Sequence, residues 1–249
     1  MPFVKASPEA QLRLLELADL DAELGRIAGR RRGLPEHAEL EQLDQRDARL
    51  RDTVAALDAQ KGDLRRAQAK AEADVEQVRS RVDRDRSRLD AGRVSNPREL
   101  ENLQSEIVSL TRRQSDLEEI VLDLMERLET AQHSHQAATA EQAEIASRRQ
   151  EVAARRDVAL GELAELSGKA EDRRGAVAGE VPADLTKLYE QLRAQHGVGA
   201  AALRRGQCQG CHLSLNTVDL NTIRAAAPDE VLRCEECRRI LVRTAESGL

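Results

Sequence analysis

The chain has 249 residues, a formal net charge of −6, and charged side chains at 34% of its positions. With one Phe, one Tyr and no Trp, it lacks the aromatic side chains on which a thick globular core usually relies. Ala, Leu, Glu, Arg and Gln dominate the first two thirds, which is typical of long helices and coiled coils. The acidic balance argues against a polycation that binds phosphate along its whole length.

The N-terminal stretch MPFVKASPE has no apolar region of the kind found in signal peptides, and no later apolar run is long enough to span a bilayer. We therefore expect a cytoplasmic protein without a membrane segment, whose thiols stay reduced. A first helix is expected over residues 8–32, where apolar side chains recur at 3–4 spacing: Leu17, Leu20, Leu24 and Ile27. Pro35 cannot continue a helix, so we expect a break near 33–35 and packing of 8–32 beside 157–176.

Two long heptad segments follow. Between Leu40 and Leu89, eleven of fifteen 3–4 positions are Leu, Val or Ala, and the exceptions are Asp47, Lys61, Gln68 and Asp85. The register resumes at Leu100 and continues to Ala170, with polar members at Gln114, His135, Gln142, Arg149 and Arg156. Heptads sustained over this length predict a left-handed coiled coil.

A turn near 92–97 separates the two segments and predicts that they fold back as an antiparallel hairpin. In this pairing Val82 faces Ile107, Leu50 faces Ala138, and Asp47 lies near Gln142. We interpret the buried polar positions as residues that fix the register rather than as a catalytic site.

The predicted fold class is therefore mainly α, with a long antiparallel coiled-coil hairpin over residues 1–180. Residues 181–202 contain a short amphipathic helix over 183–195, and then a stretch with two glycines that reads as a pivot. Residues 203–249 hold all four cysteines and are expected to form a small zinc ribbon, in which Asn216 or Thr217 caps a short helix.

The cysteines form two C-x2-C pairs separated by 22 residues, namely Cys208 with Cys211 and Cys234 with Cys237. Two such turns facing each other complete a tetrahedral shell of four thiolates, which suits one structural Zn²⁺ and leaves no open position for a substrate. The ribbon has too few apolar residues to fold by packing alone. We therefore expect Cys→Ser at any of the four cysteines to unfold the ribbon and to leave the helices intact.

The cysteines have three other interpretations: a haem attachment site, a rubredoxin-like iron site and a structural disulfide. Residues 208–212 spell C-x-x-C-H, the attachment signature of a c-type haem, with His212 in the ligand position. Haem attachment requires an exported chain, and no aromatic residue occurs among the last 50 residues to enclose a porphyrin. Iron in a rubredoxin-like site would also need an aromatic shell, and a structural disulfide is disfavoured in a reducing compartment.

Several motifs resemble the bacterial C4-type zinc ribbon family with an N-terminal coiled coil. They are Tyr189-Glu-Gln-Leu-Arg, Cys208–Leu213 with Leu215, Arg233–Leu241, and the stretch SNPRELENLQSEI at 95–107. One departure is Arg238, where the family often has Gly after the last cysteine. The resemblance implies links with nucleic-acid binding, with an alternative sigma factor of RNA polymerase, and with flagellar or secretion systems.

Three functions from different classes remain open. The first is a non-enzymatic adaptor or regulator that binds protein partners, with a link to the transcription machinery or a sigma factor. The second is direct binding of RNA or DNA by the ribbon or by an Arg-rich hairpin tip, whose candidate residues are Arg84, Arg86, Arg88, Arg93, Asn96 and Arg98. The third is a secondary-channel regulator of RNA polymerase, which is disfavoured because such factors carry an acidic tip. Self-association of the hairpin also stays open.

An enzyme is the least supported class. The sequence has no Gly-rich phosphate loop and no nucleophile elbow, and the predicted metal site is closed. Its many carboxylates occupy coiled-coil surface positions, where they form pairs within and between helices.

Overall fold

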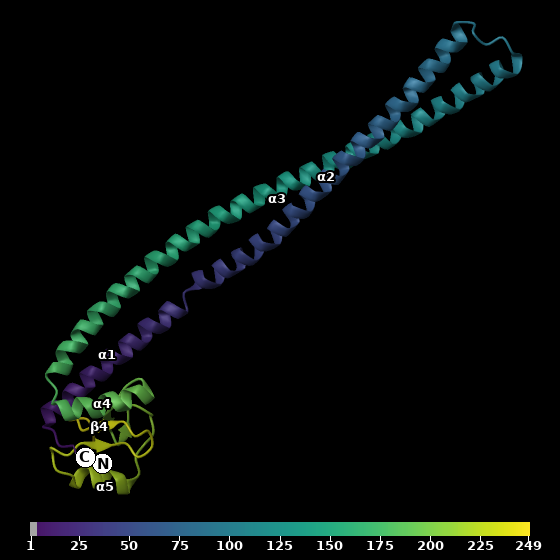
Figure 1. The fold of residues 1–249 in the computed structure, drawn as a ribbon. Coiled ribbons are helices and arrows are strands. Elements are labelled where there is room, and N and C mark those ends of the chain that lie inside the picture. Colours follow the sequence, from purple (N-terminus) through teal and green to yellow (C-terminus); the bar gives the residue numbers. More distant parts are fainter. Residues whose placement is uncertain (1–3) are drawn as a thin grey trace. The chain divides into compact units, whose positions relative to one another are not determined.

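The computed structural model describes residues 4–249 and is mainly helical (Figure 1). Helix α1 spans Pro8–Arg32, α2 spans Pro35–Asp90, α3 spans Pro97–Gly179, α4 spans Ala183–His196 and α5 spans Thr217–Ala225. Four short strands complete the fold: β1 at Ala200–Arg204, β2 at Gln207–Cys208, β3 at Leu232–Arg233 and β4 at Ile240–Val242. The expected fold class, a long helical hairpin with a small C-terminal region of strands and four cysteines, is confirmed.

The chain divides into two compact units. The first unit combines the described residues up to His37 with Ala154–Leu249, and the second unit comprises Ala38–Ala153. The sequence-based segmentation grouped the N-terminal helix with the hairpin over 1–180 and set 203–249 apart as the ribbon. In the structure, α1 shares a unit with the ribbon.

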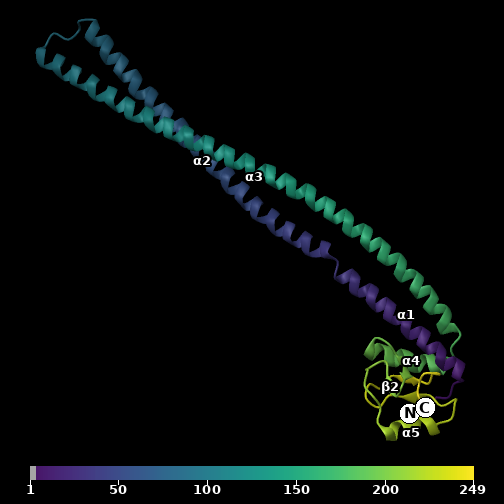
Figure 2. The ribbon, with the colours of Figure 1, turned by 180° about the vertical axis from the view of Figure 1, so that it is seen from behind.

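The second unit is an antiparallel pair of helices, and Figure 2 shows the connecting loop between α2 and α3. The loop lies between Asp90 and Pro97, and Gly92 adopts a φ of 65°, which glycine tolerates without strain. The amide of Gln142 donates to a carboxylate oxygen of Asp47 at 3.2 Å. This bond confirms the pairing that the heptads predicted.

The seam of the hairpin uses the predicted apolar positions. Its buried side chains are Leu40, Leu64, Ala71, Val82, Leu103, Leu117, Ala131, Ala138, Ile145 and Val152. Asp85 also occupies a seam position near the loop, and its side chain is buried. Within the described residues, its Oδ2 atom has no hydrogen-bond partner. A buried, unsatisfied carboxylate weakens the seam at this point.

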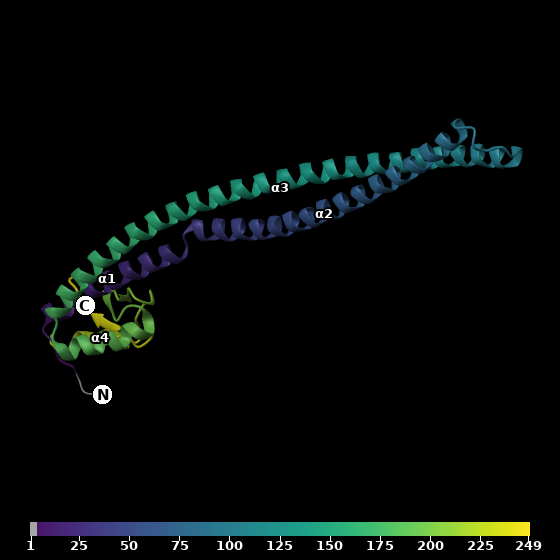
Figure 3. The same cartoon turned by 45° about the horizontal axis from the view of Figure 1, so that its top comes forward.

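The first unit contains a four-stranded sheet with the strand order β2-β1-β4-β3. Strands β1 and β4 are parallel, and β2 and β3 pair antiparallel with β1 and β4 respectively. Successive residues of a strand face opposite sides of a sheet, and the two sides of this sheet carry different cores. Figure 3 shows α4 and β4 close to α1.

One core lies between the sheet and the helices. Ile240 and Val242 of β4 pack there with Leu14 and Leu17 of α1 and with Leu185 of α4. The other core contains Leu241 from the same strand, together with Leu203, Leu215, Ile223 and the cysteines Cys208 and Cys234. One face of the sheet therefore packs against the helices, and the other face packs against the cysteine-containing core.

The stretch interpreted as a pivot, 196–202, is held on several sides. The guanidinium of Arg239 donates to the carbonyl oxygens of His196 at 3.2 Å, Val198 at 3.2 Å and Gly210 at 3.0 Å. Gly199 lies so close to Tyr189 that an added Cβ would be 2.4 Å from the Tyr189 carbonyl oxygen. These contacts tie the end of α4 to the ribbon.

The N-terminal segment also binds the ribbon. Lys5 forms an antiparallel bridge with Glu230, and the Ala6 N–H donates to the Asp229 carbonyl at 2.8 Å. The buried Gln11 amide donates to the Ala6 and Pro228 carbonyls. Among the helices of the described residues, none combines the length and apolarity needed to cross a membrane.

Candidate metal centre

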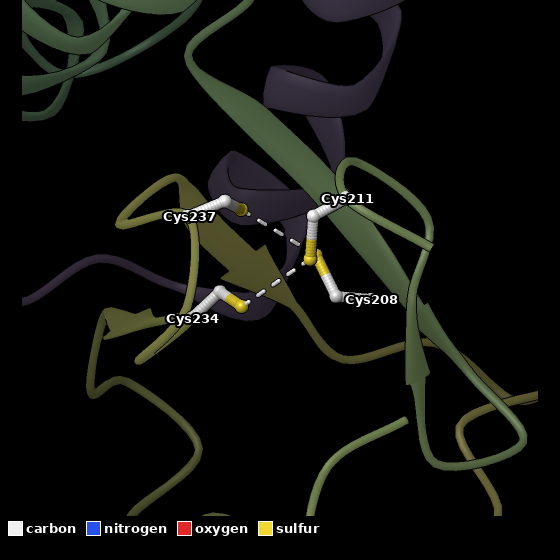
Figure 4. A group of neighbouring side chains, drawn as sticks. All are labelled: Cys208, Cys211, Cys234 and Cys237. Atoms are coloured by element: carbon white, nitrogen blue, oxygen red, sulfur yellow. Dashed lines mark hydrogen bonds between the residues drawn. The ribbon is translucent and has the colours of Figure 1, made fainter. Parts of the chain in front are cut away.

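The two C-x2-C turns bring the four cysteines together. Cys208 ends β2 and Cys234 follows β3, so the two turns approach from opposite parts of the sheet. Figure 4 shows the four side chains pointing toward one another. The Sγ atoms of Cys208 and Cys237 are 3.8 Å apart, and those of Cys211 and Cys234 are 3.9 Å apart. All four Sγ atoms lie within 4.8 Å of one another.

This arrangement fits one tetrahedral ion. Zinc–thiolate bonds are about 2.3 Å long, so a tetrahedron places neighbouring sulfurs about 3.8 Å apart. The two measured separations match that spacing closely. Because four protein ligands fill the shell, the ion would have no open position for water or substrate, and its role is to hold the fold.

The two turns have the same backbone geometry. The N–H of His212 donates to the Cys208 carbonyl, and the N–H of Arg238 donates to the Cys234 carbonyl, each at 2.8 Å. His212 and Arg238 both adopt a φ of 61°, in the left-handed region. The position after the second cysteine of each pair therefore requires a left-handed residue.

This geometry explains the haem-like spelling. His is among the residue types that are several-fold enriched at positive φ, together with Asn and Asp. His212 is exposed, and the cluster of metal-ligand side chains found among the described residues consists of the four cysteines without it. His212 thus serves the turn through its backbone conformation. The Arg238 departure occupies the equivalent strained position, where Gly would be free of strain.

Burial and hydrogen bonding shift the thiol pKa values of Cys208, Cys234 and Cys237. Burial raises the pKa of the Cys208 thiol to about 12, although backbone N–H groups of the turn lower it in part. Burial also raises the pKa of Cys234. At Cys237 burial acts in the same direction, but hydrogen bonds with Arg239, Cys234 and Cys208 together lower the pKa of that thiol. Two buried, protonated thiols become good ligands only when a cation replaces their protons.

Gly210 allows the first turn to pack tightly. An added Cβ at this position would lie 2.9 Å from the Cβ of Ala201 and 3.0 Å from the Cδ of Arg239. The Gly210 N–H also donates to the Cys208 sulfur at 3.4 Å. The glycine in the C-x-G-C motif is therefore required by the close approach of β1 and Arg239.

A second arginine holds the loop that follows α5. The guanidinium of Arg243 donates to backbone carbonyls between Ile223 and Glu230, the shortest bond being 2.6 Å to Ala227. None of the sequence motifs includes this residue. This one side chain satisfies several carbonyl groups at the end of α5 and in the loop after it, which have no helical hydrogen-bond partner.

The most important residue missed from the sequence is Asp21. Its side chain is 1% exposed and lies between two arginines, with its Oδ1 2.6 Å from the Nε of Arg174 and 2.7 Å from the Nε of Arg193. The Tyr189 hydroxyl donates to its Oδ2 at 2.5 Å, and Glu190 pairs with both arginines. Asp21 follows Leu14 and Leu17 at 3–4 spacing, a pattern that could have marked it as an inward-facing position.

This network accounts for the Tyr-Glu-x-Leu-Arg motif. Tyr189, Glu190 and Arg193 belong to the network, and Leu192 is buried in the helical core. The motif therefore joins α1, the end of α3 and α4 around one buried carboxylate.

The predicted tip residues belong to the second unit, whereas the four cysteines belong to the first. Arg84, Arg86, Arg88, Arg93 and Arg98 are all exposed. Arg88 forms a loose ion pair with Glu99 at 3.8 Å. Asn96 has a structural role, because its side-chain oxygen accepts the N–H of Arg98 and caps α3.

Comparisons with known proteins agree with this architecture. The model of the CT398-like coiled coil hairpin domain matches residues 17–197, and the model of the C4-type zinc ribbon domain matches residues 207–241. An uncharacterized protein of Mycobacterium tuberculosis is 38% identical over 243 residues, which cover 96% of this chain and 98% of that protein. An uncharacterized protein of Mycobacterium leprae is 27% identical over 223 residues, or 88% of this chain and 94% of that one.

Solved structures show the same fold. A protein from Mycobacterium smegmatis has 35% identity and a TM-score of 0.84, over 97% of this chain and 100% of its own. CT398 from Chlamydia trachomatis has 17% identity and a TM-score of 0.71, over 95% of this chain and 98% of its own. The four clustered cysteines are accordingly the ligands of one structural Zn²⁺. The chain belongs to the CT398-like coiled-coil hairpin family and carries a C-terminal C4-type zinc ribbon.

Proposed function

We propose that this zinc-binding coiled-coil protein is a non-enzymatic cytoplasmic adaptor that binds protein partners in transcription-linked regulation. The observation that carries the proposal is the closed cysteine site. With all four ligand positions supplied by the chain, the metal supports the sheet and is not placed to activate a water or a substrate. A protein built in this way acts through the surfaces that its fold presents.

The hairpin offers one such surface. Val108, Leu122 and Met125 of α3 are 70%, 59% and 48% exposed, although the apolar seam lies on another side of the helix. Val108 and Leu122 are two heptads apart, and Met125 follows one turn later, so the three side chains share a face of α3. An exposed apolar face of this kind suits contact with a helix of a partner protein.

A second candidate function is direct binding of RNA or DNA by the hairpin tip. Among the described residues, Arg84, Arg86, Arg93 and Arg98 are exposed and form no ion pair with a carboxylate. Unpaired arginines at a loop suit contacts with phosphate groups. The region lacks aromatic side chains on which bases would stack, which favours the adaptor as the first candidate.

The two candidates are separated by a pull-down from a lysate of the organism that encodes the chain, with and without nuclease. The wild type is compared with a variant in which Arg84, Arg86, Arg88 and Arg93 are changed to Ala. A matched control changes four exposed arginines elsewhere on the hairpin, Arg49, Arg65, Arg112 and Arg113, and so removes the same charge.

The adaptor proposal expects a specific protein, such as RNA polymerase or a sigma factor, that survives nuclease treatment. Recovery of nucleic acid alone, lost in the tip variant and kept in the control, would replace it with the second candidate. Capture that falls equally in the two arginine variants would indicate non-specific charge attraction and reject the tip as a site.

A further inference from the structure

A groove of about 900 Å³ lies in the first unit, among the N-terminal segment, α4, α5 and β3. One wall is the exposed side of α4, with Lys187, Leu188 and Gln191. The opposite wall includes Asp219 and Thr222 of α5. The hairpin seam and the cysteine cluster do not require this groove, so its purpose is not explained by the fold.

An edge strand lies in the groove. The strand order places β3 at the end of the sheet, where it pairs with β4 on one side. Both residues of β3, Leu232 and Arg233, line the groove together with Val231. A strand at the end of a sheet presents unpaired backbone N–H and C=O groups, which are a template for an added strand.

The chain already adds one short segment beside this strand. Lys5 forms an antiparallel bridge with Glu230, two residues before β3 begins, and both Val4 and Lys5 line the groove. An ion pair of 3.1 Å between Lys5 and Asp229 holds this segment in place. The bridge shows that extended backbone is accommodated where the groove meets the sheet.

The chemistry of the groove suits a peptide better than a nucleic acid. Among the described residues, four cationic and three anionic side chains line it, so their charges nearly balance. A phosphate backbone requires an excess of positive charge. The floor is apolar, with Leu215 and Ile223 buried and Val231 and Leu232 half-buried. Such a floor accepts apolar side chains from every second residue of an extended strand.

We propose that an extended segment of a partner protein, with apolar side chains at alternate positions, binds in this groove and pairs with the edge of β3. The proposal rests on the adaptor function and names the surface that the adaptor uses. Main-chain hydrogen bonds to β3 supply affinity, and the apolar floor between α4 and α5 selects the sequence. The second C-x2-C turn contributes Glu235 and Arg238 to the lining, so we expect loss of zinc to disrupt the site.

The probe is a phage-displayed library of random linear peptides, selected against the zinc-loaded full chain. Two variants fill the groove from exposed wall positions, Gln191→Trp on α4 and Thr222→Trp on α5. Matched controls place the same side chain at exposed positions outside the lining, Gln195→Trp and Asn221→Trp. Circular dichroism and one bound zinc per chain establish that each variant is folded.

We expect enriched peptides with apolar residues at alternate positions. They should bind the two control variants as they bind the wild type, and the groove variants at least about tenfold more weakly. Binding should slow hydrogen exchange at β3, and methylation of alternate backbone amides of the peptide should abolish it. Peptides that bind groove and control variants equally, or that show a helical 3–4 pattern, would overturn the proposal.

Three further outcomes have different meanings. Concentration-dependent dimerisation that is lost in Gln191→Trp would make a second copy of the chain the occupant. If a lysate partner binds the groove variants as well as the wild type, the adaptor function stands and the groove proposal fails. If no lysate protein is captured while displayed peptides still bind the groove, the adaptor function fails and the groove remains a peptide site.

Discussion

Tyr189 of α4 donates its hydroxyl hydrogen to Asp21 of α1 at 2.5 Å, although 168 residues of sequence separate them. Both side chains are almost completely buried. Because Arg174 at the end of α3 and Arg193 of α4 contact the same carboxylate, one acidic side chain holds three helices together. Tyr189 is also the chain's only tyrosine, so it reports on this unit without labelling.

Asp21→Asn should strongly destabilise the first unit. The substitution leaves two arginines facing a neutral amide, and breaking a buried ion pair in this way costs about 3–5 kcal/mol. Glu23→Gln is the matched control two residues along α1, because Glu23 pairs with Arg173 at the surface. An exposed pair is worth about 1 kcal/mol or less. Chemical denaturation followed by tyrosine fluorescence measures both, and equal losses would contradict this account.

Stability should fall at alkaline pH through Tyr189. Burial, and then the hydrogen bond to Asp21, raise the pKa of Tyr189 above its ordinary value of about 10. Below about pH 10 the hydroxyl is neutral in the folded and unfolded states, so its contribution to stability is complete. Above about pH 10 the unfolded chain ionises first, and the free energy of unfolding decreases.

The control for this effect is Tyr189→Phe, which has no proton to lose. Its free energy of unfolding should decline less steeply above about pH 10 than that of the wild type. Tyrosinate absorbance of the folded wild type should appear only at higher pH than in the denatured chain. If the free energy of unfolding falls equally in the two proteins, groups other than Tyr189 cause the loss of stability at alkaline pH.

Zinc removal should disrupt α1 and α4 as well as the ribbon. The sequence suggested that the helices would remain after a Cys→Ser change, but Ile240 and Val242 bring the sheet into the core of α1 and α4. Zinc binding is worth on the order of 10 kcal/mol in small domains, which is comparable to the whole stability of a protein.

Cys234→Ser, or a chelator, should therefore change the fluorescence of Tyr189 and reduce the helical signal in circular dichroism. The helices of the second unit, Ala38–Ala153, should remain. Adding Zn²⁺ after chelation should restore the signal, and adding Mg²⁺ should not, because Mg²⁺ prefers oxygen ligands. A tyrosine signal that is unaffected by chelation would mean that the helical core stands without the metal.

The left-handed positions of the two turns predict opposite effects for two substitutions. His212→Gly should maintain or raise stability by up to about 1 kcal/mol, because Gly adopts a positive φ without strain. His212→Val should lower stability, since a β-branched residue fits this region poorly. Arg238→Gly and Arg238→Val should have the same opposite effects as the two changes at His212, because the φ of Arg238 is also 61°. Competition with a zinc chelator measures the effect, and equal retention of zinc by the Gly and Val variants would argue against it.

Asp85→Leu should stabilise the hairpin. It replaces a buried carboxylate whose Oδ2 has no partner among the described residues with an apolar side chain suited to the seam. Relieving such a group is worth about 1–3 kcal/mol. Asp83→Leu is the matched control, because Asp83 is exposed two residues away. Thermal unfolding followed by circular dichroism tests the pair, and an unchanged midpoint for Asp85→Leu would show that the carboxylate is already accommodated.

Much of the fold could be predicted because its signals are local. Heptad spacing located α2 and α3 and paired Asp47 with Gln142, and the cysteine spacing identified the metal ligands. These features depend on period and chemistry within short windows. The break between α1 and α2 falls at Gly33-Leu34, next to the proline that indicated it.

The rest depends on contacts between distant segments. Asp21 continues the 3–4 spacing of Leu14 and Leu17, but its ion pairs can be known only once Arg174 of α3 and Arg193 of α4 pack against α1. The packing of α1 against the ribbon likewise depends on a distant segment, because Ile240 and Val242 of β4 enter the core that contains Leu14 and Leu17. The positive φ of His212 arises from the turn that the first cysteine pair forms, and the C-x-x-C-H spelling by itself does not indicate this conformation.

The bridge between Lys5 and Glu230 joins two segments that are synthesised at very different times. Residues near both ends of the chain enter one core, so α1 leaves the ribosome long before its packing partners Ile240 and Val242 are synthesised. The hairpin between them can form its contacts as soon as α3 emerges, so we expect it to fold first. Until β4 has been synthesised, Leu14 and Leu17 lack their partners Ile240 and Val242, and we expect this apolar face of α1 to be prone to aggregation in the nascent chain.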